Sequence, residues 1–173
     1  MLVAVISDIH DNLANLDIFL RWAVRKQVEE LVCCGDVCSL ATLSHLSAAF
    51  AGPIHLVRGN ACLYSQAEAE KLSNVRGGGR IGRWEIGGVL VGACHEPYLL
   101  DEVLSAGKCN YVFYGHTHQP ALGRRGEVLS ANPGTLAGLL NRASFACLDT
   151  ASGKLSLKIV DCLPEALDAS QSF

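Results

Sequence analysis

The chain has 173 residues, a length typical of one domain, and it can bury roughly 70% of its unfolded surface in a core. Half of its residues are hydrophobic and 18% are charged, which excludes a disordered chain. The formal net charge of −3 argues against a general nucleic-acid binder, whose binding face is usually basic. It leaves room for a phosphate-bearing substrate, because bound cations can supply local positive charge.

The cysteines and the N-terminus both favour a cytoplasmic protein. Most of the eight cysteines lie in apolar runs such as residues 31–34, and none has the Cys-x-x-Cys spacing of a zinc knuckle. We therefore expect reduced core thiols rather than a disulfide framework. The apolar run at residues 2–6 is too short for an export signal, and no stretch reaches the ~20 apolar residues of a membrane span.

The first third of the chain predicts alternating strands and helices. Residues 2–6 form a β-branched run without alternation, which is typical of a strand covered on both faces. Asn12 then predicts the N-cap of a helix that carries leucines at helical spacing. Residues 31–34 and 54–57 indicate two further buried strands, with a helix over residues 40–50 between them. This order is the pattern of parallel βαβ units.

Beyond residue 60 the pattern changes to shorter elements. We expect helices at residues 66–72 and 98–106, with a glycine loop at residues 77–79. The expected strands span residues 80–86, 89–94, 111–114, 127–130, 144–148 and 155–160. Residues 132–135 form a predicted tight turn. We treat residues 1–173 as a single domain, with residues 161–173 as a tail that can fray.

Side chains that can bind metals follow five of the predicted strands. In open α/β sheets, functional sites form beyond the carboxyl ends of the strands, so a sheet would bring these residues together. They are Asp8, His10, Asp36, Asn60, His95, His116 and His118. Carboxylates, imidazoles and an amide without a thiolate suit manganese, iron, zinc or nickel better than calcium. With one shared carboxylate, such a set can serve two cations that activate water for displacement at phosphorus.

Each of these motifs alone has an ordinary structural explanation. Gly35-Asp36 is a common turn sequence, and a histidine such as His95 often forms a hydrogen bond in or near a core. His116 and His118 are more specific, because two histidines directly after a strand point to one region. The joint occurrence of the motifs at strand ends favours a functional site.

In this order, the motifs resemble those of the calcineurin-like metallophosphoesterase superfamily. The resemblance rests on Ser7-Asp8-Ile9-His10, Gly35-Asp36, Arg58-Gly59-Asn60, His95 and Gly115-His116-Thr117-His118. The turn Asn132-Pro133-Gly134-Thr135 and the compact length are similar to those of the small bacterial and archaeal phosphodiesterases. The resemblance implies a four-layer α/β/β/α sandwich of two mixed β-sheets flanked by helices.

The resemblance also implies how the ligands divide between two divalent ions. The first ion would be held by Asp8, His10, Asp36 and His118, and the second by Asp36, Asn60, His95 and His116. A hydroxide between the ions would attack phosphorus, so the ligands of the second ion would act in catalysis through the metals. Manganese is the expected metal, with iron, nickel, cobalt or zinc as alternatives. Asn12 and Arg58 are the expected substrate contacts, whereas Arg124 and Arg125 are expected to be surface arginines.

Four positions depart from the family pattern. The family usually has Gly-Asn-His-Asp/Glu or Gly-Asn-Cys-Asp, whereas this chain has Ala61 and Cys62 after Asn60. Without that histidine, we expect a preference for good leaving groups. We expect Cys62 to be a bystander thiol. Asp11 and Glu96 stand where glycine is usual, and both add negative charge near the site.

Three functional hypotheses are compatible with the sequence. The first is an enzyme acting on small or nucleotide-like phosphodiesters, without stable nucleic-acid or membrane binding, either as a monomer or as a homo-oligomer. The second is a scaffold with little or no activity, because the vacuolar sorting subunit of retromer resembles this family and serves mainly as an interaction platform. The third is a phosphomonoesterase or protein phosphatase of the same superfamily, which the missing histidine disfavours. The completeness of the ligand set favours the enzyme.

Overall fold

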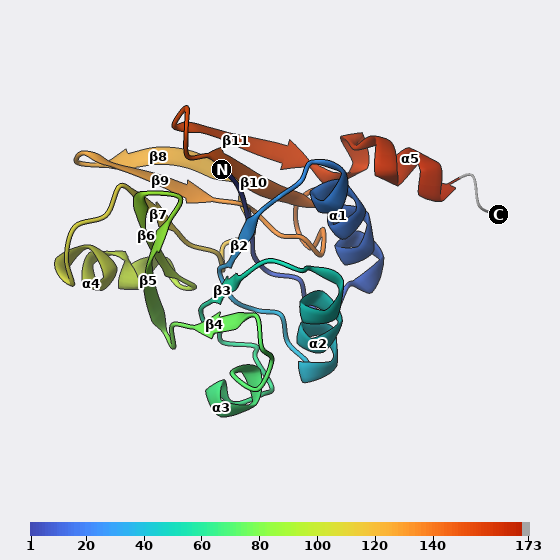
Figure 1. Cartoon of the computed structure of the whole chain (residues 1–173), viewed down its shortest axis with the longest axis horizontal. Coiled ribbons are helices and arrows are strands. Elements are labelled where there is room, and N and C mark those ends of the chain that lie inside the picture. The colour runs from blue at the N-terminus through green and yellow to red at the C-terminus, as the bar shows by residue number, and fades with distance from the viewer. Residues whose placement is uncertain (171–173) are drawn as a thin grey trace.

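Two mixed β-sheets form the centre of the protein, seen here in a computed structural model that describes residues 1–170, with side chains described through residue 167 (Figure 1). In spatial order, the six-stranded sheet consists of β11 (Lys154–Ile159), β10 (Ser144–Asp149), β1 (Leu2–Ile6), β2 (Glu30–Cys33), β3 (Ile54–Leu56) and β4 (Val75–Gly77). The five-stranded sheet consists of β5 (Ile81–Ile86), β6 (Val89–Cys94), β7 (Tyr111–Phe113), β9 (Val128–Asn132) and β8 (Ala121–Arg125).

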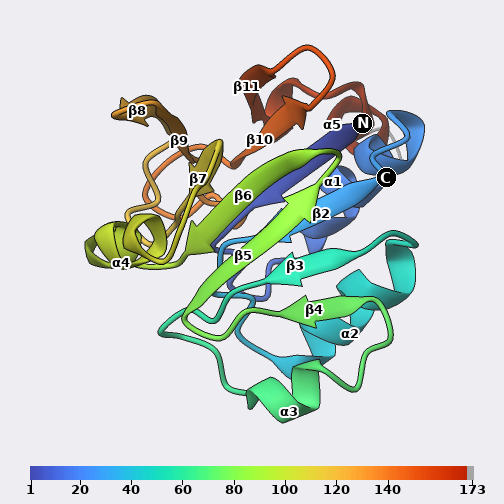
Figure 2. The same ribbon diagram turned by 60° about the vertical axis from the view of Figure 1, so that its left-hand side comes forward.

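The helices lie on the outer faces of the sheets. They are α1 (Leu13–Arg25), α2 (Leu40–Ala49), α3 (Gln66–Ala69), α4 (Leu100–Ser105) and α5 (Pro164–Ser170), with 3-10 turns η1 (Pro97–Leu99) and η2 (Val160–Cys162). Figure 2 shows β5 and β6 in front of the first sheet, with α1 and α2 behind it. The order of layers is therefore helix, sheet, sheet, helix, as the resemblance implied.

Alternating side chains of the strands feed separate cores. In β1, Ile6 points into the core shared with α1 and α2, whereas Val3 and Val5 point into the core between the sheets. A third core lies between the five-stranded sheet and α4, where Val103 contacts the strands. Because both faces of β1 are covered, its sequence is continuously apolar, and this explains the absence of alternation in residues 2–6.

Parallel pairing sets up the functional edge. Strands β1, β2, β3 and β4 run parallel, and so do β6, β7 and β9. The predicted cap of α1 is confirmed, since Asn12 Oδ1 accepts the Asn15 N–H at 3.1 Å. Strands β4 and β8 were not expected. β4 is a three-residue strand that ends in Gly77, which the sequence placed in a loop, and β8 is a largely exposed edge strand without an apolar pattern.

Other boundaries shifted by a few residues. The helix expected at residues 66–72 ends at Ala69, and the one expected at residues 98–106 divides into η1 and α4. The tail expected to fray contains the end of η2 and all of α5, and residues 171–173 lie outside the described residues. The Arg25 guanidinium on α1 pairs with the buried carboxylate of Glu165, which ties α5 to the first helix layer.

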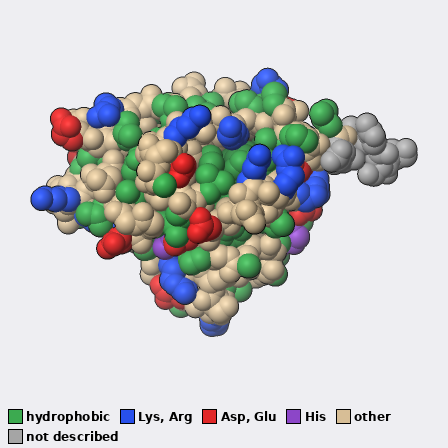
Figure 3. Space-filling model, turned by 45° about the horizontal axis from the view of Figure 1, so that its top comes forward, with side chains coloured by type: hydrophobic (Ala, Val, Ile, Leu, Met, Phe, Trp, Pro, Cys, Tyr) green, Lys and Arg blue, Asp and Glu red, His purple; other side chains and the backbone are tan. Residues whose placement is uncertain are grey.

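The cysteines and the charged surface residues are distributed as the composition led us to expect. All eight cysteines are free, and four of them are buried, as expected for reduced core thiols. Within residues 1–170, no helix combines the length and the apolar character that a membrane crossing requires. On the face drawn in Figure 3, basic side chains form a small group near the C-terminal end and are otherwise separated by uncharged or acidic side chains.

Candidate metal centre

All seven predicted ligands lie on the loops that follow β1, β2, β3, β6 and β7. The first three strands belong to one sheet and the last two to the other, so the loops meet where the carboxyl ends of both sheets converge. Their donor atoms form a continuous series of neighbours, each within 4.0 Å of the next. The structure thus brings together residues that are up to 110 positions apart in the chain.

Asp8, His10 and His118 form a compact triangle, which we call the inner group. His118 Nε2 lies 3.2 Å from Asp8 Oδ1 and 3.2 Å from His10 Nε2, and His10 Nε2 lies 3.6 Å from Asp8 Oδ1. The Asp8 side chain is fully buried, and the two imidazoles are 21% and 12% exposed. Donor atoms at this spacing are those expected around one ion with bonds of about 2.0–2.2 Å.

Asn60, His95 and His116 form what we call the outer group. Asn60 Oδ1 lies 3.0 Å from both His95 Nε2 and His116 Nδ1. His95 is fully buried, whereas Asn60 and His116 are exposed at the mouth of the site. The outer group therefore faces solvent on the side where a substrate can approach.

Asp36 lies between the two groups. Its Oδ2 is 3.2 Å from His95 Nε2 and 4.0 Å from His10 Nε2, so one carboxylate oxygen faces both groups. Its Oδ1 accepts the Ala61 N–H at 2.8 Å, which fixes the carboxylate plane. This is the position that a bridging ligand requires.

Hydrogen bonds on the far side of the rings set the tautomers of two imidazoles. His95 Nδ1 lies 2.7 Å from the Cys34 carbonyl, and His118 Nδ1 lies 3.1 Å from the Leu139 carbonyl. A carbonyl only accepts, so each Nδ1 carries the proton and each neutral ring points the Nε2 lone pair into the site. His10 Nδ1 instead faces the Cys38 thiol, with Sγ at 3.5 Å.

An unsatisfied carboxylate oxygen is a second sign that the donor set suits metal ions. Asp8 Oδ1 is buried, and within the described residues no donor satisfies it. It faces His10 Nε2 and His118 Nε2, and the latter is a lone-pair nitrogen in the neutral ring. Lone pairs that converge without a hydrogen between them repel one another, and a cation placed among them removes the repulsion.

The backbone is strained where the ligands lie. Five ligands adopt left-handed conformations, with φ between 43° and 69°. They are Asp8, His10, Asp36, His116 and His118. Such conformations are unfavourable for residues other than glycine, and they cluster at functional sites where surrounding contacts hold them. Glycine is required beside them: a Cβ on Gly59 would overlap Asp36 Oδ1, and a Cβ on Gly115 would overlap Ser7 Oγ.

The buried pair of His95 and Asp36 shifts the pKa of both groups. Burial favours neutral forms, but the hydrogen bond and the charge of Asp36 outweigh it, so the pKa of His95 lies above its ordinary value of 6.5. For Asp36, burial is likewise outweighed, chiefly by His95 and by the Ala61 N–H, so its pKa lies below 3.8. A cation that binds there competes with a proton for His95 Nε2.

The end of β9 and the turn that follows it brace both ligand loops. Asn132 is fully buried, and its Nδ2 donates to the Gly115 carbonyl and to Thr117 Oγ1, both at 2.9 Å. Thr135 Oγ1 donates to the Asp8 carbonyl at 3.0 Å. The predicted turn at residues 132–135 thus joins the loop that carries His116 and His118 to the loop that carries Asp8, a role that the sequence did not reveal.

The other predicted site residues lie at the rim. The Asn12 amide donates to the Ala137 carbonyl at 2.9 Å, and its role as a substrate contact stays a prediction. Cys62 Sγ donates to Tyr64 Oη at 3.6 Å. Asp11 Oδ1 accepts the Ser39 N–H at 3.0 Å and the hydroxyl of the same residue at 2.8 Å.

Cys38 was missed by the sequence analysis, because nothing in its local pattern separates it from the other thiols. Its thiol lies against His10, at the inner edge of the site. Burial raises the pKa of the Cys38 thiol to about 11, with further increases from the charges of Asp11 and Asp36. The group is therefore a neutral thiol at physiological pH.

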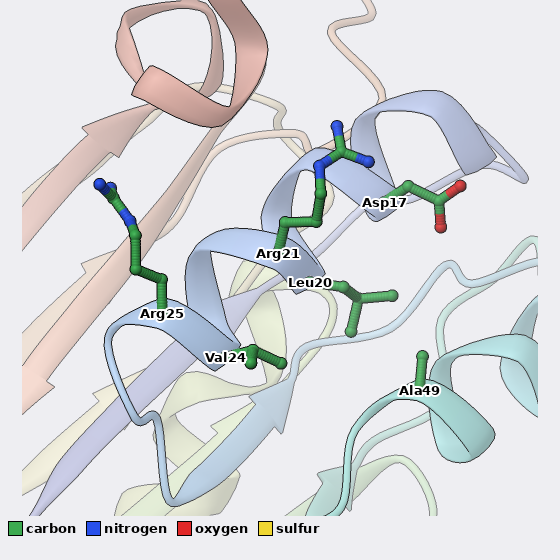
Figure 4. A pocket seen from close by; sticks show the side chains of 6 residues that line it. All are labelled: Asp17, Leu20, Arg21, Val24, Arg25 and Ala49. Carbon is green, nitrogen blue, oxygen red and sulfur yellow. The ribbon is translucent and has the colours of Figure 1, made fainter. Parts of the chain in front are cut away.

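A separate hollow of about 430 Å³ lies between α1 and α2, away from these residues (Figure 4). Leu20 and Val24 extend from α1 toward Ala49 of α2, while the ends of Arg21 and Arg25 point away from them. None of the predicted site residues lines this hollow. Its lining combines three apolar with three charged residues and contains no histidine, unlike the residues at the strand ends.

The fold is that of the metallophosphoesterases, and the strand ends carry groups of side chains that could hold metal ions. A family model for the calcineurin-like phosphoesterase superfamily domain matches residues 1–153, and the chain belongs to that superfamily. No curated protein sequence matches the chain significantly.

Similar solved structures include an archaeal phosphodiesterase, with a TM-score of 0.82 and 23% identity, covering 92% of this chain and 99% of that one. The phosphoesterase Yfce from E. coli has a TM-score of 0.68 and 22% identity, covering 92% of this chain and 100% of that one. Vps29 of Entamoeba histolytica in complex with zinc has a TM-score of 0.67 and 20% identity, covering 91% and 96%. At these identities, the similarities establish the fold.

Proposed function

We propose that the protein hydrolyses small phosphodiesters with two divalent metal ions, one held by the inner group and one by the outer group, with Asp36 shared. The observation that carries the proposal is the position of Asp36 Oδ2, which faces His10 of one group and His95 of the other. When bound, two such ions would supply Lewis acidity toward phosphoryl oxygens and would activate a water nucleophile.

The residues of the chain would prepare the site in three ways. The carboxylates of Asp8 and Asp36 offset the charge of the cations, and both are held by N–H donors, from His116 and Ala61 respectively. Carbonyl partners keep the Nε2 atoms of His95 and His118 free of protons in the neutral rings. Buried ligands on one side and exposed ones on the other leave a single direction for substrate entry.

Manganese is the metal we propose first. The proposed ligands are oxygen and nitrogen atoms, and the nearest thiol, Cys38, contacts His10 rather than completing a ligand triangle. Such sets suit manganese and also admit iron, nickel, cobalt or zinc. The zinc complex of the related Vps29 makes zinc the alternative to test beside manganese.

The residue after Asn60 supports our proposal of diester rather than monoester hydrolysis. Ala61 has no group that could donate a proton to a leaving oxygen. We therefore propose a preference for substrates with acidic leaving groups, and the phosphodiesterase among the similar structures supports this choice. We place the enzyme in the cytoplasm, where its free thiols would stay reduced.

A scaffold function is the second candidate, and the similarity to Vps29 favours it. The two candidates make opposite predictions about turnover, because a scaffold can keep metal ligands without catalysing a reaction. Activity measured together with metal content therefore separates them.

The test is an assay of metal-stripped protein on bis(p-nitrophenyl) phosphate, with and without added manganese. We expect manganese-dependent turnover that falls by about 100-fold to 1000-fold in His116→Ala. The matched control is His45→Ala, which removes an exposed histidine that pairs with Asp17 on α1, outside the site. No turnover with manganese, zinc, iron, nickel or cobalt, despite stoichiometric metal binding, would favour the scaffold.

A further inference from the structure

Beside the outer group, the surface has a hollow of about 290 Å³ that holds two arginines, and we call it the arginine pocket. It is lined by Arg58, Gly59, Asn60, Cys62, Arg80 and Glu96. Asn60 also belongs to the candidate metal centre, where its Oδ1 lies 3.0 Å from His116 Nδ1. The arginine pocket and the metal centre thus share a wall.

Loops from both sheets build the arginine pocket. Arg58 follows β3, and Arg80 follows β4, whose parallel pairing with β3 aligns the two loops. The Arg58 N–H donates to the Gly79 carbonyl at 2.7 Å, which holds these loops together. Glu96 comes from the other sheet, directly after His95 at the end of β6. Arg80 was invisible as a site residue in the sequence, because β4 itself was not recognised.

The two guanidinium groups keep most of their donors unused. Arg58 Nη2 makes one long contact with the Cys62 carbonyl, at 3.4 Å, and Arg80 Nη2 donates to Tyr98 Oη at 2.9 Å. By contrast, the Arg83 guanidinium donates to three backbone carbonyls. Among the side chains of residues 1–167, ion pairs occupy other arginines but neither of these two. Each guanidinium has five N–H donors, so both can bind a ligand.

We propose that the arginine pocket binds a second anionic group, a carboxylate or a phosphate, on one arm of the phosphodiester substrate. The proposal rests on the proposed function, because it assumes that the phosphodiester itself lies at the metal centre. A planar guanidinium matches the oxygens of carboxylate and phosphate, which makes two unpaired arginines a suitable receptor. Glu96 is the one carboxylate in the lining, so the positive charges outnumber it.

The kinetic test compares two substrates that differ only in the charge of one arm. They are 2-carboxyethyl 4-nitrophenyl phosphate and its methyl ester, and a 2-phosphonoethyl analogue distinguishes phosphate from carboxylate. With the manganese-loaded protein, we expect kcat/KM to be about 10-fold to 100-fold higher for the anionic arm. Arg58→Gln and Arg80→Gln should each move this ratio toward one, and Glu96→Gln should raise it.

Arg124→Gln is the matched control, because Arg124 is an exposed arginine that does not line the arginine pocket. On β8 it pairs with Leu129, near the start of β9. It should leave the ratio of the two substrates unchanged. A ratio at or below one in the unmodified protein would overturn the proposal, even with high turnover of the methyl ester.

A binding measurement separates this proposal from the proposed function. Calorimetry would compare 3-phosphonopropionate with propylphosphonate, which lacks the carboxylate, on the manganese-loaded protein. Tighter binding of 3-phosphonopropionate that is lost in both arginine variants supports the pocket, even in a protein without turnover. Turnover without that preference contradicts the pocket alone, and equal or absent binding of both phosphonates also overturns it.

Discussion

The inner and outer groups hold a similar set of donors but differ in how firmly the protein fixes them. All three inner residues have left-handed backbone, and Thr135 braces the Asp8 loop from the other sheet. In the outer group, the side chains of Asn60 and His116 are exposed and contact each other, and only the loop that carries His116 is braced, by Asn132. We infer that the inner group binds its ion more tightly and that the outer group is adapted to exchange contacts with the substrate.

The largest expected effect comes from removing what both groups share. Asp36→Asn should lower kcat on bis(p-nitrophenyl) phosphate by about 1000-fold or more, because it weakens the binding of both ions at once. Metal content measured by mass spectrometry should fall at both positions. Asp17→Asn, at an exposed carboxylate paired with His45, is the control. An Asp36→Asn protein that keeps two ions would refute the bridging role.

A substitution in the outer group should sharpen the comparison. Asn60→Ala should release one ion of two and lower kcat on the order of 100-fold, while the inner ion stays bound. Titration calorimetry with manganese would resolve two affinities in the unmodified protein and one in the variant. If the variant instead lost the tighter ion, the proposed ranking of the two groups would be reversed.

Protons should compete with the metal ion at the outer group. Asp36 raises the pKa of His95, so protons should begin to compete with the metal above pH 6.5. As the pH is lowered further, the metal affinity of the outer group should fall by up to about tenfold per pH unit. In the metal-free protein, the pH dependence of stability has the opposite direction. The His95–Asp36 pair contributes stability that is full below pH 6.5 and is lost as the pH rises through the raised pKa of His95.

Melting temperatures of the metal-free and manganese-loaded forms between pH 5.5 and 8 would measure both effects. The metal-free form should lose part of its stability on the alkaline side, and the manganese-loaded form should lose its extra stability on the acidic side. Parallel pH profiles for the two forms would contradict the assigned titration of His95.

The smallest expected effect concerns the inner group and Cys38. Cys38→Ala should weaken binding of the inner ion only a few-fold, because a thiol contact at 3.5 Å orients His10 less firmly than the backbone carbonyls orient His95 and His118. Cys38→Ser, which keeps a polar partner, should recover part of the loss. Cys162→Ser, at an exposed cysteine, serves as the control, and manganese calorimetry is the measurement.

Local sequence carried much of this architecture. Continuous apolar runs predicted the buried strands, and Asn12 predicted the start of α1. The sequence did not predict strands β4 and β8, because short or exposed edge strands bury little apolar surface and show no alternation of apolar and polar residues. For the same reason the arginine pocket was not predicted, since the position of Arg80 depends on the pairing between β4 and β3.

By itself, the sequence determined which side chains end the strands, because a buried strand must be apolar and a polar residue marks its exit from the core. It therefore identified Asp8, Asp36 and the histidines as candidates from their positions in the chain alone. Only the tertiary structure decided that Asp36 faces both ligand groups, that Asn132 braces their loops, and that Arg58 and Arg80 share a pocket. These relations join residues on different strands and sheets, and such distances depend on packing and register rather than on neighbours in the chain.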